Sequence, residues 1–286
     1  MKKMRIGKIA YTNILPVFYF VHEKLRDDHI EWIPQVPAQL NQQMKMGNID
    51  LGPISAFAYA QSIDQYLLLP DLSVSALGPV GSIFLFSKVP INELEGKTIA
   101  LTNTSATSVN LLRILLQKFY QVNAHYRTML PNLTVMMEEA DASLLIGDDA
   151  LKASWNNPGY RVYDLGELWY RQTGKWMTFA VWAVNKSFAD REEELLNHVF
   201  EVFQYSKKQS RNRLNELLQY TIQRHGGTIE FWRNYFSGLN HDLNKEQVEG
   251  LEYYFYCAYE LGLLDHPVTV NLWNPSRPKL PGSFNT

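Results

Sequence analysis

The sequence predicts an α/β protein organised in two lobes, and three observations support this. Between Arg5 and Val184, short apolar runs typical of strands alternate with helical patterns, as in largely parallel sheets. A second such series begins at the segment INELEGKTIAL, residues 91–101. After Asn185 the alternation stops and the remaining chain has a helical period. We therefore expect two sheets followed by a helical C-terminal portion.

The first series should form a βαβαβ unit and two further strands. Pro16 and Pro37 stand where the first turn of a helix tolerates proline, so helices are expected over 17–25 and 37–46. The turn Gly78-Pro79-Val80-Gly81 should separate the last two strands. The expected strands are 5–10, 31–36, 49–54, 72–77 and 82–87.

The second series contains a clearly amphipathic helix over 105–120, with leucines recurring on one face. Its other expected helices are 148–154 and 165–173, and its expected strands are 98–101, 124–129, 143–146 and 178–184. Beyond it, the pattern predicts helices over 190–224, 229–236 and 245–261, and a Pro-rich polar tail over 275–286. We expect the chain to cross between lobes near 86–89 and to return near 176–182.

Composition excludes several classes of protein. The 286 residues are 46% hydrophobic and 20% charged, with a net charge of −2, so no bulk positive charge favours nucleic acid. No apolar run approaches the ~20 residues that span a bilayer, and the N-terminus lacks the apolar core of a signal peptide. With a single cysteine as well, the sequence indicates a cytoplasmic protein that binds neither nucleic acid nor membrane.

The common motifs of cofactor and nucleophile chemistry are missing. The chain has no GxGxxG, GxxxxGK[ST], HExxH or paired CxxC motif, and no GxSxG nucleophile elbow. Its seven histidines show no spacing typical of metal ligands. We expect no cofactor and no metal.

Small polar residues instead follow several predicted strands, where open α/β sheets bind ligands. The densest group is Asn103-Thr104-Ser105-Ala106-Thr107-Ser108, which precedes an apolar helix. A single residue suffices to cap that helix, so the additional hydroxyls and free N–H groups suit a carboxylate. Asn13, Ser55, Ser82 and Asp148 stand at other strand ends, where each side chain either caps a helix or faces a cleft.

Several ordered segments resemble the chorismate dehydratase family of the futalosine pathway of menaquinone biosynthesis. The resemblance extends over most of residues 4–186. Its segments are YTNILPVFY, GNIDLGPISAFAY, LGPVGSIFLFSK, LTNTSATSVNLLRILL, EEADASLLIGDDAL and FAVWAVNK.

The resemblance implies a fold like that of the type II periplasmic binding proteins, with two lobes, a two-stranded hinge and a substrate cleft between the lobes. Lobe 1 would contain residues 1–86 and 181–286, including the C-terminal helices, and lobe 2 residues 87–180. The implied enzyme is a carbon–oxygen lyase that converts chorismate to 3-[(1-carboxyvinyl)oxy]benzoate and water. It would act on this small molecule as a monomer or homodimer.

The resemblance also implies roles for individual residues. Asn13 and Ser82 would lie nearest the reacting ring, and Asp148 would stand on the rim of lobe 2. Because no histidine occurs in the matching segments, we hypothesise that the enolpyruvyl carboxylate of the substrate takes the ring proton, with Asp148 as the competing base. The implied substrate-binding residues are Ser55, Ser105, Thr107, Ser108 and Gly147.

Three alternatives stay open. The related 1,4-dihydroxy-6-naphthoate synthase shares the implied fold but resembles a pattern with His in place of Gly147. A non-catalytic protein of the same fold would bind a small carboxylate unchanged. A sensing or partner-binding domain would use the C-terminal helices as its surface, including the aromatic cluster around Tyr254, which is more simply explained as core.

Overall fold

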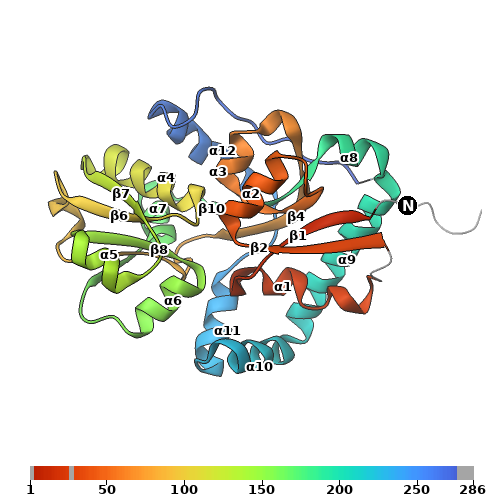
Figure 1. Cartoon of the computed structure of the whole chain (residues 1–286), viewed down its shortest axis with the longest axis horizontal. Helices are drawn as coiled ribbons and strands as arrows, with labels where there is room; N and C mark the ends of the chain where they lie inside the picture. The colour runs from red at the N-terminus through yellow and green to blue at the C-terminus, as the bar shows by residue number, and fades with distance from the viewer. Residues whose placement is uncertain (1–2, 26–28, 276–286) are drawn as a thin grey trace, which may run out of the picture.

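A computed structural model describes residues 3–25 and 29–275. The expected tail over 275–286 therefore lies outside the described residues except for Pro275. Two five-stranded sheets form two lobes that lie side by side in Figure 1. The first sheet has the order β2-β1-β3-β10-β4 and the second β7-β6-β8-β5-β9. This confirms the two-sheet α/β architecture predicted by the strand and helix pattern.

The first sheet combines parallel and antiparallel pairs. Strands β1, β2 and β3 are parallel, whereas β10 lies between β3 and β4 and is antiparallel to both. A methyl group on Gly7 of β1 would lie 2.1 Å from the Leu40 side chain of helix α2 (Pro37–Lys45), so glycine lets this helix pack closely on the strand. The strands are β1 (Met4–Ile9), β2 (Ile30–Gln35), β3 (Leu51–Ser55), β4 (Tyr66–Ala76) and β10 (Met177–Asn185).

Short helices connect these strands. The expected helix over 17–25 is wrong as a continuous element: a 3-10 helix (Thr12–Ile14) leads into α1, which has only four residues, and a second 3-10 helix (Val21–Glu23) follows. The α-helices here are α1 (Leu15–Phe18), α2 (Pro37–Lys45) and α3 (Ala56–Ala60).

The second sheet is built on β5, which lies between β8 and β9. Its strands are β5 (Ile83–Ser87), β6 (Thr98–Thr102), β7 (His125–Met129), β8 (Ala142–Ile146) and β9 (Arg161–Asp164). Its α-helices are α4 (Ala106–Ile114), continued by a π-helix (Leu115–Tyr120), α5 (Leu133–Glu139), α6 (Gly147–Trp155) and α7 (Leu165–Thr173). Strand β9 and helix α5 have no counterpart among the expected elements.

The chain enters the second sheet earlier than the predicted boundary at 86, whereas its return falls at the start of the predicted range 176–182. It leaves the first sheet after Ala76 and enters the second at Ile83, and it returns between Thr173 and Met177. The reason is that β5 is apolar and pairs on both edges inside the second sheet, so it cannot belong to lobe 1. Met177 already pairs with Ala76 in the first sheet.

The C-terminal portion is helical, as predicted, but the expected helix over 190–224 is broken twice. Glu192 and Arg213 have non-helical backbone angles. At the second break, the Arg213 guanidinium binds Glu23 and Glu216 and lies over the ring of Phe20, contacts that periodicity does not reveal. The helices are α8 (Lys186–Arg191), α9 (Glu193–Asn212), α10 (Leu214–His225), α11 (Ile229–Gly238) and α12 (Lys245–Glu260).

Helices α11 and α12 contact the second lobe. Trp232 of α11 packs edge-on against Trp155 of α6, and the Tyr254 hydroxyl of α12 donates to the Thr107 carbonyl of α4. Their position near the junction is visible in Figure 1. The C-terminal helices therefore cover the junction rather than lobe 1 alone.

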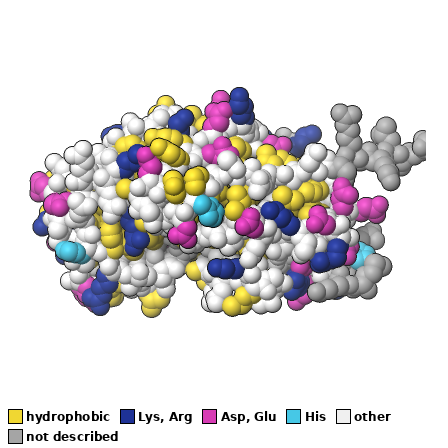
Figure 2. Space-filling model, turned by 90° about the horizontal axis from the view of Figure 1, so that it is seen from above, with side chains coloured by type: hydrophobic (Ala, Val, Ile, Leu, Met, Phe, Trp, Pro, Cys, Tyr) yellow, Lys and Arg dark blue, Asp and Glu magenta, His cyan; other side chains and the backbone are white. Residues whose placement is uncertain are grey.

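The surface carries mixed charge. On the face shown in Figure 2, Lys and Arg side chains are interspersed with Asp and Glu and form no extended patch of one sign. Among the helices of the described residues, none has the length and apolar character needed to cross a bilayer.

Candidate functional site

A small cavity of about 50 Å³ lies between the two lobes, where several strands end. Five of the eight predicted site residues line it: Asn13, Ser55, Ser105, Ser108 and Gly147. Ile9, Tyr11, Ile14, Pro37, Ile83, Ile146, Phe179 and Ala180 complete the lining. The structure therefore brings these five residues together around one cavity. Ser82, Thr107 and Asp148 lie nearby but outside the lining.

Asn13 presents an amide with unused hydrogen-bonding capacity. It lies in the 3-10 helix directly after β1, and its Oδ1 atom is buried without a hydrogen-bond partner among the described residues. Its backbone carbonyl accepts a hydrogen bond from His241 Nε2 at 2.7 Å. Burial lowers the pKa of His241 to about 4, so this ring is neutral near pH 7 and Nε2 carries the donated proton. The loop is thus fixed by the backbone, which leaves the Asn13 amide free for a ligand.

Ser55 lines the cavity from the end of β3 in the first lobe and also caps helix α3. Its Oγ accepts from the Ala58 N–H at 3.2 Å at the start of α3, and Asn41 donates to the same oxygen at 3.3 Å. The capping alternative left open by the sequence is therefore correct for Ser55, and the residue lines the cavity as well.

Ser105 and Ser108 form the second-lobe wall at the N-terminus of α4. The Ser105 Oγ accepts from the Ser108 N–H at 3.2 Å and donates to the Ser108 Oγ at 3.0 Å. Ser105 is thus the single N-cap that this nine-residue helix needs. Ser108, one turn into the helix, keeps its hydroxyl proton for another acceptor.

Gly147 brings the end of β8 against the first lobe. Its φ is +58°, a left-handed conformation that favours glycine, and its N–H donates to the Ser82 carbonyl at 2.7 Å. A Cβ at this position would lie 3.0 Å from the Tyr11 ring. Glycine therefore permits the close approach of Tyr11.

The other three predicted residues form hydrogen bonds away from the cavity. Thr107 is fully buried, and its Oγ1 accepts from the Phe57 N–H of the first lobe at 3.0 Å. Asp148 Oδ1 accepts from the Thr12 hydroxyl at 2.6 Å, and Oδ2 lies 3.6 Å from His225 Nδ1. The buried Ser82 Oγ accepts from the Tyr235 hydroxyl at 3.0 Å. In this geometry Thr107 and Asp148 connect the lobes to each other, and Ser82 is connected to helix α11.

Sequence reasoning missed three residues that shape the site. Tyr11 lines the cavity, Tyr235 donates to Ser82, and His241 fixes the Asn13 loop. Tyr11 could have been found, since it adjoins Asn13 in the first matching segment. Tyr235 and His241 lie more than 150 residues from their partners in the helical part, and no local pattern marks them.

The lining of the cavity is uncharged and combines polar with apolar side chains. No Asp, Glu, Lys, Arg or His is among its lining residues. Within residues 3–25 and 29–275, no cluster of three or more His, Cys, Asp or Glu is arranged to hold a metal ion. The hydroxyls, the Asn13 amide and the N-terminus of α4 can bind a carboxylate through hydrogen bonds and the helix dipole.

Comparison with solved structures identifies the fold class. A protein from Archaeoglobus fulgidus superposes with a TM-score of 0.73 at 20% identity, covering 92% of this chain and 98% of that one. The periplasmic aliphatic sulphonate binding protein of Escherichia coli superposes with a TM-score of 0.69 at 17% identity, covering 100% and 98%. The chain therefore has the type II periplasmic binding protein fold, as predicted.

Sequence comparison identifies the family. Residues 4–260 match the family described as Menaquinone biosynthesis, and the chain belongs to this family. The chain is 29% identical to chorismate dehydratase of Thermus thermophilus over 92% of this chain and 97% of that protein. It is 30% identical to 1,4-dihydroxy-6-naphthoate synthase of the same organism, over 61% of this chain and 63% of that protein.

Proposed function

We propose that this protein is a chorismate dehydratase, a hydro-lyase that forms 3-[(1-carboxyvinyl)oxy]benzoate and water from chorismate. The observation that carries the proposal is the alignment with chorismate dehydratase across 92% of this chain. The alignment with the naphthoate synthase reaches only 61% at the same level of identity. The hydroxyls and the Asn13 amide in the uncharged cavity are compatible with a dicarboxylate held by hydrogen bonds and a helix N-terminus.

The reaction removes the proton on the ring carbon that carries the ether and hydroxide from the neighbouring carbon. The double bond that forms makes the ring aromatic, which supplies the driving force. No lining side chain is an ordinary general base. This supports a step in which the enolpyruvyl carboxylate of the substrate takes the proton.

In this proposal the protein orients the substrate. The unpartnered Asn13 amide and the Ser108 hydroxyl would hold the conformer in which the carboxylate reaches the ring proton. Asp148 is a weaker candidate for the base, because Thr12 already donates to one of its oxygens and His225 faces the other.

The cavity must enlarge before a molecule of this size can enter. Its volume of about 50 Å³ is far below the ~300–1,000 Å³ usual for ligand pockets. The hydrogen bonds Thr12–Asp148 and Phe57–Thr107 connect the two lobes. We therefore expect these bonds to break as the lobes separate to admit the substrate.

The decisive experiment incubates the purified chain with chorismate and follows the product by mass and aromatic absorbance. Loss of one water and appearance of a substituted benzoate would support the proposal. Chorismate that binds but stays unchanged would instead favour a non-catalytic carboxylate-binding protein. Absence of both binding and turnover would direct attention to the substrate of the naphthoate synthase.

A further inference from the structure

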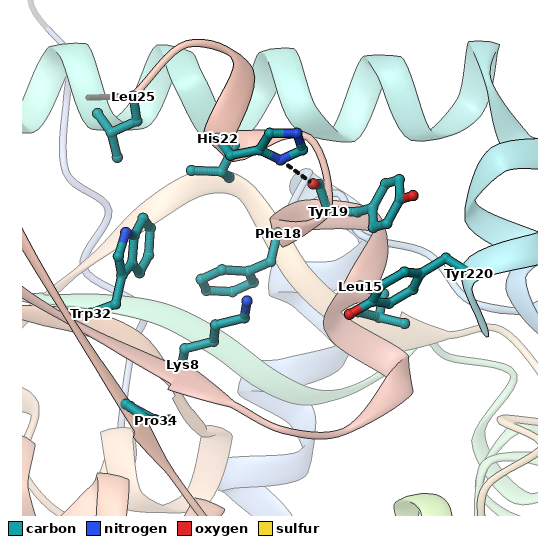
Figure 3. A pocket seen from close by; sticks show the side chains of 10 residues that line it. Lys8, Leu15, Phe18, Tyr19, His22, Leu25, Trp32, Pro34 and Tyr220 are labelled. Atoms are coloured by element: carbon teal, nitrogen blue, oxygen red, sulfur yellow. Dashed lines mark hydrogen bonds between the residues drawn. The ribbon is translucent and has the colours of Figure 1, made fainter. Parts of the chain in front are cut away.

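A second and much larger concave surface lies on the first lobe, outside the cavity between the lobes. Figure 3 shows this groove, which has a volume of about 690 Å³. An adjoining hollow of about 460 Å³ shares Lys8, Phe18 and Tyr220 with it and continues to Arg224. No residue with a role in the proposed reaction lines the larger groove.

The groove exists because α1 is too short to cover the sheet. Alternate residues of a strand face the same side, so Lys8 lies on the same face of β1 as Ile6. The paired residues of edge strand β2 are Pro34 and Trp32. Helix α1 has only four residues, and beyond it this face of the two strands lines an open groove.

The groove walls are aromatic. Phe18 packs edge-on against Trp32, with ring centroids 6.0 Å apart, and on the opposite wall Tyr19 lies 4.8 Å from Tyr220. Phe18 is buried, whereas Trp32, Tyr19 and Tyr220 are partly exposed. The three partly exposed rings can stack against a flat ligand ring.

Two cations occupy this aromatic surface. The Lys8 ammonium lies 5.9 Å from the centre of the Phe18 ring, and Figure 3 shows it pointing into the groove. The Arg224 guanidinium lies 4.7 Å from the centre of the Tyr220 ring. Desolvation of the ammonium and repulsion by the positive charge of Arg224 lower the pKa of Lys8.

Neither cation is neutralised by a carboxylate among the described residues. The nearby acids have other partners. Glu23 and Glu216 bind Arg213, and Asp148 binds Thr12 and faces His225. The groove thus combines stacking surfaces with two adjacent positive charges that lack a counterion.

We propose that this groove is a second binding site, for a small planar carboxylate. The ring would stack among Trp32, Tyr19 and Tyr220, and the carboxylate would lie between Lys8 and Arg224. The volume fits the range of ligand pockets, ~300–1,000 Å³. An anion would relieve the repulsion between the two cations, whereas a neutral ring would only stack. The site does not depend on the reaction proposed above.

The test measures binding of 2-naphthoate to the full chain by calorimetry, with the neutral 2-naphthamide as a matched probe. We expect K8M and R224M each to weaken naphthoate binding about tenfold, since each removes one charged hydrogen-bond donor. R161M removes an exposed arginine from the second lobe and should leave binding unchanged. N13L should also leave it unchanged, because Asn13 lines only the cavity between the lobes.

Three outcomes would overturn the proposal. Naphthamide binding as tightly as naphthoate would show that the two cations do not contribute to binding of the carboxylate. Equal naphthoate affinity for the wild-type protein, K8M and R224M would show the same. Loss of binding in N13L with retention in K8M would place the probe between the lobes. Circular dichroism spectra of all variants would verify that the exposed substitutions leave the fold intact.

Discussion

The Thr12 hydroxyl donates to Asp148 Oδ1 at 2.6 Å, and the Thr12 backbone N–H donates to the same oxygen at 3.2 Å. Thr12 follows β1 in the first lobe and Asp148 is the second residue of α6 in the second, so both bonds cross the junction. Asp148 stands at a strand end, a position that suits a catalytic group. In this structure it instead holds the two lobes together.

We therefore expect the D148N variant to remain an active enzyme. The amide oxygen of Asn can still accept from Thr12, so kcat should fall by less than about tenfold, and any effect should appear mainly in KM. The measurement is steady-state dehydration of chorismate, with T12V as the matched control that removes the other half of the contact. A loss beyond about a thousandfold with substrate binding intact would make Asp148 the base, since general bases contribute roughly 10²–10⁴-fold.

Asn13 and Asn41 allow a matched comparison of an amide that lines the cavity with one that only supports a lining residue. Asn13 Oδ1 has no partner among the described residues, whereas the Asn41 side chain makes two hydrogen bonds with Ser55. N13L should lower turnover about 10²–10³-fold, as loss of a preorganised polar contact does, and leave the free energy of unfolding unchanged or higher.

N41L should show the opposite stability effect. It leaves the Ser55 N–H without its acceptor, which should cost about 1–3 kcal/mol in urea denaturation. A stability loss in N13L equal to that in N41L would contradict the assignment of Asn13 as a ligand-facing group.

Alanine substitutions at Gly147 and Gly174 can distinguish the effect of backbone strain from an effect on closure of the lobes. Both have positive φ, +58° and +66°, so alanine at either position should cost about 1–2 kcal/mol. Only at Gly147 would the new Cβ meet Tyr11, whereas nothing lies within 4 Å of the Cβ position at Gly174. G147A should therefore also weaken substrate binding several-fold, and G174A should not. Equal binding by the two variants would show that Tyr11 moves without cost.

His241 should make stability depend on pH. Its pKa is about 4 in the folded protein, against about 6.5 when unfolded, so the unfolded chain binds more protons between these values. Stability should thus rise as pH increases from 4 to 6.5 and fall as pH decreases through that range. Between pH 4.5 and 7 the contribution should be on the order of 2 kcal/mol.

The measurement is urea denaturation of the wild-type protein and H241Q at several pH values. A Gln amide can still donate to the Asn13 carbonyl but does not titrate, so H241Q should lack this part of the slope. The same slope in both proteins would mean that other groups cause the pH dependence.

Much of the cavity was predictable because strand ends are readable locally. Asn13, Ser55, Ser105 and Gly147 each follow an apolar run, and an open sheet gathers such positions along one edge. Whether each side chain faces the cavity is decided by contacts between lobes. Thr107 is two residues from Ser105, yet its hydroxyl is bonded to Phe57.

The C-terminal portion was less predictable for a physical reason. The helical period of the sequence does not change at Arg213, because the helices on both sides bury an apolar face. The contact made at the break is with Glu23, which is distant in the sequence. The contacts of Tyr235 and His241 likewise depend on tertiary packing. Tyr235 of α11 meets the turn before β5, and His241, after α11, meets the loop that follows β1. The crossing points moved for a similar reason, since strand pairing rather than composition assigns β5 to the second sheet.

The central position of β10 in the first sheet has a consequence for biosynthesis. Strands β3 and β4 emerge from the ribosome about a hundred residues before β10, the strand that fills the space between them. Until then each has an exposed edge, whereas residues 83–173 contain every strand of the second sheet. We therefore expect the second lobe to fold first during translation and the first lobe to be completed only after its synthesis. A chaperone that shields strand edges would act during this interval.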